Sequence, residues 1–138
     1  MPLQLDIVTP EKKIFSDTVE NVYLPGADGE LGILPMHSCL VTALKPGELR
    51  YLHAGNQVTL AIGSGFAEVT QTKVLVLTDM ALGEDEIDVQ KAEEAIQRAE
   101  EKLKGVEHSM DAEEVAYLQG IIAKSAAALH VKLKHGRS

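Results

Sequence analysis

The sequence is poor in the residue types that build disulfides, metal centres and base-stacking surfaces. Its one cysteine, Cys39, excludes an internal disulfide and any zinc site made of several cysteines. It has no tryptophan, and aromatic residues make up only 4% of the chain, so base stacking cannot contribute much binding energy. No basic cluster lies near Cys39, and we therefore expect a small buried side chain rather than a reactive thiol.

Long apolar segments are also missing. No run approaches the roughly 18 to 20 apolar residues that a helix needs to cross a bilayer. The first residues, MPLQLDIVTPEKK, lack the apolar core of a signal peptide and the Arg/Ser bias of a transit peptide. We therefore expect a soluble protein on the cytoplasmic side that is not processed at its N-terminus.

The acidic charge is unevenly distributed along the chain. The net charge is -8 for 138 residues, and it divides into -4 over residues 1–83, -8 over 84–114 and +4 over 115–138. Nucleic acid is a poor partner for such a chain, because phosphate binding needs a concentrated basic face. The basic C-terminal segment could instead contact an acidic protein surface.

The pattern of apolar residues predicts a β-domain up to Gly83. Short runs rich in β-branched residues alternate with turn formers, which is typical of a sandwich or barrel, and we expect roughly seven to ten strands. Alternation in LQLDIV places Leu3, Leu5 and Ile7 on one apolar face. The four consecutive apolar residues 74–77 predict a strand that is covered on both faces.

After Gly83 the apolar period becomes helical. A first helix is predicted to end at Gly105, and a second to begin at Asp111, with Glu114 completing a capping box. The short connector makes the two helices antiparallel neighbours. The apolar stripe of the first helix consists of Val89, Ala92, Ile96, Ala99 and Leu103, and that of the second of Val115, Leu118, Ile122, Leu129 and Leu133.

The predicted hairpin is rich in alanine and carries Gly120 within its second helix. Small side chains let two backbones approach closely but bury little apolar area, and a mid-helix glycine costs about 1 kcal/mol relative to alanine. We therefore expect the hairpin to be held weakly and to detach from the β-domain at modest cost. A permanently docked hairpin is the alternative.

Catalytic and metal-binding patterns are absent from the sequence. No two histidines have the i, i+4 spacing of a helical zinc motif, and Ser64 lies in GSG rather than in a nucleophile elbow. The segment 25–47, PGADGELGILPMHSCLVTALKPG, predicts a tight and rigid surface loop, which could equally be a structural turn. We thus expect no catalytic residue and no metal site, and a binding or structural role.

Four segments in order, GELGILPMH, KPGELR, GSGFAEV and IDVQKAEEAIQRAEEKL, give the chain a close resemblance to the epsilon subunit of bacterial F-type ATP synthases. This resemblance extends over essentially the whole chain. It implies a ten-stranded β-sandwich at residues 1–83 followed by an antiparallel two-helix hairpin at 84–138. It also implies a non-catalytic rotor subunit on the cytoplasmic face of the plasma membrane, which couples the c-ring to the gamma subunit of a proton-translocating synthase.

The family's functional residues can be placed on this sequence. The resemblance assigns contact with the c-ring to Glu30, Gly32, Pro35 and His37. It makes the hairpin a regulator that extends toward the alpha and beta subunits and inhibits ATP hydrolysis there. The basic residues available to meet an acidic beta surface are Lys124, Lys132, Lys134 and Arg137.

Some relatives bind ATP on the folded hairpin through the pattern I/L-D-x-x-R-A. The matching residues are Ile87, Asp88 and Ala92, with Arg98 further along, but Lys91 replaces the first arginine. Lysine keeps the charge and loses the planar fork, so we expect at most weak regulatory ATP and no required cofactor. Asp88 is equally well explained as a helix N-cap. The alternative for the whole chain is a free-standing β-sandwich that binds a small ligand or a protein.

Overall fold

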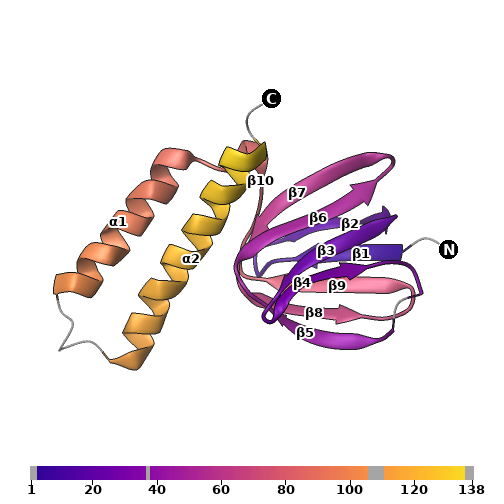
Figure 1. The fold of residues 1–138 in the computed structure, drawn as a ribbon, viewed down its shortest axis with the longest axis horizontal. Coiled ribbons are helices and arrows are strands. Elements are labelled where there is room, and N and C mark those ends of the chain that lie inside the picture. The colour runs from indigo at the N-terminus through magenta and orange to yellow at the C-terminus, as the bar shows by residue number, and fades with distance from the viewer. Residues whose placement is uncertain (1–2, 37, 106–110, 136–138) are drawn as a thin grey trace.

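A ten-stranded β-domain stands beside a helical hairpin (Figure 1). The computed structural model describes residues 3–36, 38–105 and 111–135. The strands are β1 (Leu3–Val8), β2 (Lys13–Val19), β3 (Asn21–Gly26), β4 (Gly29–Ile33), β5 (Leu40–Leu44), β6 (Gly47–His53), β7 (Asn56–Ile62), β8 (Gly65–Val69), β9 (Lys73–Thr78) and β10 (Ala81–Gly83). A short 3-10 helix, η1 (Glu84–Glu86), leads into α1 (Val89–Gly105) and α2 (Ala112–His135).

The strands form one continuous hydrogen-bonded path that folds over itself. Their order is β10-β7-β6-β3-β5-β8-β9-β1-β2, and β4 pairs with β3 beside this path. β1 pairs with β9 in parallel, whereas the other described pairs are antiparallel. The strands form two layers (Figure 1), and an apolar core of strand residues is buried in the domain. The predicted fold, a ten-stranded β-sandwich followed by two helices, is confirmed.

Alternation along the strands explains the core. Leu3, Leu5 and Ile7 are fully buried, as their spacing predicts, and the residues between them are half-buried. Facing strands contribute Leu24 and Leu49 to the same cluster. Each such side chain contributes roughly 1.5 to 3 kcal/mol by leaving water, so the β-domain has a core of its own that does not depend on the helices.

The expectation that residues 74–77 are covered on both faces is wrong. β9 alternates like the other strands: Val74 and Val76 are buried in the core, Leu75 is half-buried, and Leu77 is 48% exposed. The hairpin packs instead on the layer that contains β6 and β7 (Figure 1). A second covered face is therefore found on β7, where Ala61 is fully buried beneath α2.

Both helices begin where the sequence predicts. The Asp88 carboxylate accepts a hydrogen bond from the Lys91 backbone N–H at 3.1 Å. The Asp111 carboxylate accepts one from the Glu114 N–H at 2.8 Å. These side chains satisfy backbone donors that the first turn of a helix leaves unpaired. The two helices pack against each other, and the buried residues of the hairpin include Ala92, Ala99, Leu118 and Ala127.

Three details of the predicted packing are wrong. Leu133 is 54% exposed, and Val131, outside the predicted stripe, is fully buried, because α2 has one side toward α1 and another toward the sandwich. Gly120 makes no close approach, since a Cβ atom there would meet nothing within 4 Å. Cys39 is exposed in the segment before β5 rather than buried. Within the described residues, no helix has the length and apolar character needed to span a membrane.

Candidate functional site

The hairpin docks on the sandwich through the C-terminal half of α2. Val131 and Ala128 pack against Ala61 of β7 and Ile87, the residue that follows η1. Two half-buried side chains, Met80 and Leu82, complete this cluster, which we call the docking seat. Only Val131 among the α2 members is a large side chain, so the apolar part of the seat contributes a few kcal/mol at most.

Charged groups of α2 surround the docking seat. The Lys132 ammonium donates a hydrogen bond to the Glu84 backbone carbonyl at 3.1 Å. The Lys134 ammonium lies 3.3 Å from Glu48 Oε2 of β6. Lys124 pairs with Asp79 at 3.6 Å. In this state Lys124 and Lys134 thus bind the sandwich and Lys132 binds η1, whereas Arg137 lies outside the described residues.

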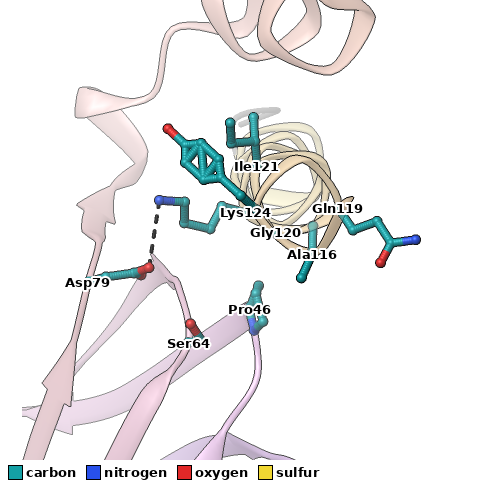
Figure 2. Close-up of a pocket in the computed structure, with 10 residues that line it drawn as sticks. Pro46, Ser64, Asp79, Ala116, Gln119, Gly120, Ile121 and Lys124 are labelled. Carbon is teal, nitrogen blue, oxygen red and sulfur yellow. Dashed lines mark ion pairs between the residues drawn. The ribbon is translucent and has the colours of Figure 1, made fainter. Parts of the chain in front are cut away.

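The N-terminal half of α2 is separated from the sandwich by a groove. Figure 2 shows Pro46, Ser64 and Asp79 on the sandwich side and Gly120 on the helix side, with the Lys124–Asp79 ion pair across the opening. The groove has a volume of about 460 Å³. Half of α2 therefore adds little apolar contact, and the docking seat provides most of the attachment.

The residues predicted to contact the c-ring lie on and after β4. Glu30 and Gly32 belong to β4 and are exposed, and Pro35 follows the strand and is half-buried. His37 lies outside the described residues. A Cβ atom on Gly32 would lie 2.9 Å from Cε1 of the Tyr23 ring, so this position needs glycine for close packing of the β3–β4 hairpin. Glu30 and Gly32 thus lie along β4, with Glu30 next to the β3–β4 turn, and Pro35 lies beyond the other end of the strand.

Two apolar residues in the same loop were missed. Leu34 and Met36 are both largely exposed. Met36 has φ 67°, a left-handed conformation that favours glycine, while its backbone N–H donates to the Gln71 carbonyl at 2.8 Å. Exposed apolar side chains on a conformationally constrained loop suit contact with a partner. Because the segment has no apolar period, pattern analysis did not separate these residues from core positions.

A cluster of charged side chains that joins β4 and β6 was also not predicted from the sequence. Arg50 of β6 reaches Glu30 Oε2 at 3.0 Å and Glu48 Oε1 at 3.6 Å. Its guanidinium carbon lies 4.6 Å from the centre of the Tyr23 ring. Period-two alternation in KPGELR places Glu48 and Arg50 on the face opposite the buried Leu49, but it does not indicate that Arg50 meets Glu30.

The opposite layer carries an apolar surface, which we call the outer patch. Its members are Val41 of β5, Phe66 of β8 and Leu77 of β9, exposed by 72%, 60% and 48%. Phe66 pairs directly with Leu77 across the two strands. Adjacent exposed apolar side chains on a sheet favour a protein-binding role. The run of apolar residues 74–77 contains part of this signal, but such a run predicts coverage on both faces rather than an exposed patch.

The residues of the predicted ATP pattern do not all face one place. Ile87 is buried in the docking seat, Asp88 caps α1, and Ala92 is buried within the hairpin. Lys91 and Arg98 are exposed on α1, seven residues apart and hence on one side of the helix. Three of the five residues thus have structural contacts of their own.

No group of three or more potential metal ligands occurs among the residues that the structure describes.

Two family models match consecutive parts of the chain. The β-sandwich domain of the ATP synthase delta/epsilon chain matches residues 2–84, and the long α-helix domain of the same chain matches residues 85–117. The ATP synthase epsilon chain of Desulforamulus reducens is 48% identical over 126 residues, which cover 90% of this chain and 96% of that protein. The epsilon chain of Anaeromyxobacter sp. (strain Fw109-5) is 46% identical over 75% of this chain and 78% of its own length.

Solved structures share the fold at lower identity. A chain in the Euglena gracilis mitochondrial ATP synthase has a TM-score of 0.77 at 24% identity, over 96% of this chain and 81% of that chain. A chain in the Tetrahymena thermophila mitochondrial ATP synthase central stalk and c-ring has a TM-score of 0.62 at 14% identity, over 97% and 96% of the two chains. The sandwich with its helical hairpin is thus a recurrent arrangement.

The docking seat predicts that one side chain controls release of the hairpin. Replacing Val131→Asp buries an unpaired carboxylate and should weaken docking by about 2 kcal/mol or more. We expect a thiol placed in the seat, Ala128→Cys in a Cys39→Ser chain, to react with a thiol reagent at least about tenfold faster. The control is Leu133→Asp, which adds the same charge at an exposed position. Equal labelling rates for the two variants would contradict this assignment.

Proposed function

The chain belongs to the ATP synthase delta/epsilon chain family, and we propose that it works as the central-stalk epsilon subunit of a bacterial proton-translocating F-type synthase. The observation that carries this proposal is 48% identity to an epsilon chain over nearly all of both proteins. The subunit is non-catalytic: it couples rotation of the c-ring to the gamma subunit while other chains make ATP. The family match favours this role over a free-standing binding module.

The outer patch supports a binding site for the gamma subunit. Val41, Phe66 and Leu77 present apolar side chains on a sheet face away from the hairpin. Burying such side chains against a partner stabilises a complex by the same apolar transfer that stabilises a core. Because the patch lies on paired strands of the sandwich, gamma would be held by a rigid element.

The features of β4 and of the segment that follows it support the contact with the c-ring. Glu30 and Gly32 are exposed on the strand, and the exposed apolar residues Leu34 and Met36 flank Pro35 after it. A rotor connection must transmit torque without yielding. Strand pairing from Val22 to Gly26 against β4, and glycine packing on Tyr23, keep this strand stiff.

The subunit would lie on the cytoplasmic face of the bacterial plasma membrane as a peripheral protein. The curated relatives described above come from bacteria. Attachment through gamma and the ring places it at the membrane without inserting any part of it.

The hairpin is proposed to inhibit ATP hydrolysis when it leaves the docking seat. In the docked state Lys124 and Lys134 pair with carboxylates of the sandwich, and Lys132 donates a hydrogen bond to η1. Release makes these cations available to acidic surfaces of the alpha and beta subunits. The same residues would thus stabilise both arrangements, which keeps their free energies close.

A weak regulatory ATP site on α1 is also proposed. Lys91 and Arg98 offer two exposed cations on one side of the helix, and phosphate groups are attracted to such pairs. Arg98 is partly engaged by Glu94 at 3.6 Å. No required cofactor follows from this site.

Binding of gamma is tested by a change in the outer patch. Phe66→Asp places a charge in a surface that must be desolvated, and we expect at least about a tenfold loss of affinity for gamma. Co-purification of tagged variants with alpha, beta and gamma chains from bacterial membranes measures this effect. Thr72→Asp, on the exposed turn between β8 and β9, is the control. Normal recovery of all three chains with Phe66→Asp would remove the patch from the gamma site.

Inhibition by the tail is tested by neutralising its basic end. We expect replacement of Lys132, Lys134 and Arg137 by Ala to raise the ATPase rate of the assembled complex without loss of assembly, because the extended hairpin loses its cationic contacts. The control is Val131→Ser, which loosens the docking seat but keeps every charge and should strengthen inhibition. Unchanged inhibition in the triple variant would reject the role of these residues.

The ATP site is tested by isothermal titration of the isolated subunit. We expect weak binding, with a Kd on the order of 1 mM, because a lysine replaces the arginine that could hold phosphate with two hydrogen bonds. Lys91→Arg should tighten binding and Lys91→Ala should abolish it. The absence of heat at millimolar ATP for both the wild-type chain and Lys91→Arg would eliminate this site.

A further inference from the structure

Arg50 pairs with Glu30 and lies in a row with Gly32, the two β4 residues that were assigned to ring contact. Tyr23 is paired with Arg50 on one side and with Gly32 on the other, so these three residues form a row across β6, β3 and β4. The Arg50 guanidinium lies over the Tyr23 ring and pairs with Glu30 at 3.0 Å. The direction of the Glu30 carboxylate therefore depends on where Arg50 is held.

Glu48 connects this row to the hairpin. It lies two residues before Arg50 on the same face of β6, and its side chain is only 12% exposed. One carboxylate oxygen faces Arg50 Nε at 3.6 Å, and the other faces Lys134 Nζ at 3.3 Å and His130 Nε2 at 3.9 Å. A single, largely buried carboxylate is thus shared between α2 and the arginine that holds Glu30.

One hydrogen-bond donor of Arg50 has no partner among the described residues, which indicates that the guanidinium could adopt a second position closer to Glu48. Its Nε atom is buried and makes no hydrogen bond within the described part of the chain. A buried unsatisfied donor is costly. Movement of the guanidinium toward Glu48 would satisfy this donor and would lengthen the pair with Glu30. In the docked state this movement is less favourable, because the Lys134 ammonium partly neutralises the Glu48 carboxylate and so weakens its attraction for Arg50.

We propose that Arg50 is the positioning residue for Glu30. Because Glu48 is shared between Arg50 and α2, the position of the Arg50 guanidinium depends on whether α2 is docked. When α2 leaves, Glu48 loses the cationic groups of the helix, attracts Arg50 more strongly and frees Glu30. The coupling is reciprocal: a partner that draws Glu30 away sends Arg50 to Glu48, weakens the Lys134 contact and favours release of the hairpin. Its meaning for the ring rests on the proposed function, whereas the coupling itself is a property of this chain.

The expected size of the coupling is small. Glu30 and Lys134 are about half exposed, at 55% and 51%, and exposed ion pairs contribute little because water and salt screen them. We expect a two- to fivefold change in the undocked population, typical of one such pair. The effect should decrease as ionic strength increases.

The experiment is a double-mutant cycle in the isolated full-length subunit. The readout is the labelling rate of Ala128→Cys in the Cys39→Ser chain, which is proportional to the undocked population. Glu30→Gln should raise the rate two- to fivefold, although the ion pair of Glu30 is with Arg50 of β6 and not with a residue of α2. Asp28→Asn, which removes the same charge from the adjacent turn, should leave it unchanged. In an Arg50→Ala background, Glu30→Gln should have no effect.

Conservative replacement separates positioning from simple loss of stability. Arg50→Lys retains the charge but cannot serve two carboxylates with a planar fork, so it should reduce the Glu30→Gln effect while leaving thermal unfolding unchanged. If Arg50→Ala fails to fold, Arg50→Gln replaces it in the cycle. An equal effect of Glu30→Gln with and without Arg50, or no effect with Arg50, would overturn the coupling. Failure of the ring assignment is distinct, since it would appear as normal coupling of assembled complexes with Glu30→Gln.

Discussion

The small size of the docking seat limits how strongly the hairpin is attached to the sandwich. A 24-residue helix, α2, meets the sandwich mainly through Val131 and Ala128, and a groove separates its other half from the sandwich. Had α2 covered the sheet with large aliphatic side chains, the hairpin would be part of the core and could not leave. Attachment by one large side chain and several polar contacts keeps docking within a few kcal/mol.

The sandwich, in contrast to the docking seat, is held together by a large apolar core. Its core is closed between two layers and includes fully buried residues such as Leu5, Leu24 and Val76. Loss of the hairpin exposes Ala61 and Ile87, which belong to a separate small cluster, and leaves this core untouched. The apolar contacts of the chain are therefore divided into a large cluster inside the sandwich and a small one beneath the hairpin, and this division is what the proposed release of the hairpin requires.

The sequence predicted the architecture because it depends on local, repeating signals. Strand alternation from Leu3 to Ile7, the switch to a helical period after Gly83, and the N-caps Asp88 and Asp111 each indicate an element without knowledge of its neighbours. Which face an element turns to its neighbour is a tertiary property. That is why Leu77 and Leu133 were assigned to covered positions, and Val131 was missed.

The site was less predictable for the same reason. The ring-contact residues came from the resemblance, because Glu30 and Gly32 have no distinctive pattern of their own. Arg50 and Glu48 become informative only when β6 lies between β3 and β7 and α2 packs alongside. A carboxylate shared by residues 50 and 134 joins segments that are far apart in the sequence, and a single sequence contains no periodic signal for such a meeting.

A weak seat surrounded by ion pairs is well suited to control by partners. Reversing a two-state equilibrium from 99:1 to 1:99 requires about 5.5 kcal/mol of differential binding. Lys124, Lys132 and Lys134 can exchange contacts with the sandwich for contacts with another acidic surface, so little polar interaction is lost in the transfer. The remaining free-energy cost of undocking is the exposure to water of the apolar side chains around Val131, which is fully buried in the docked state. Under the proposed function, one protein interface would have to compensate for the loss of that small apolar contact when the hairpin extends.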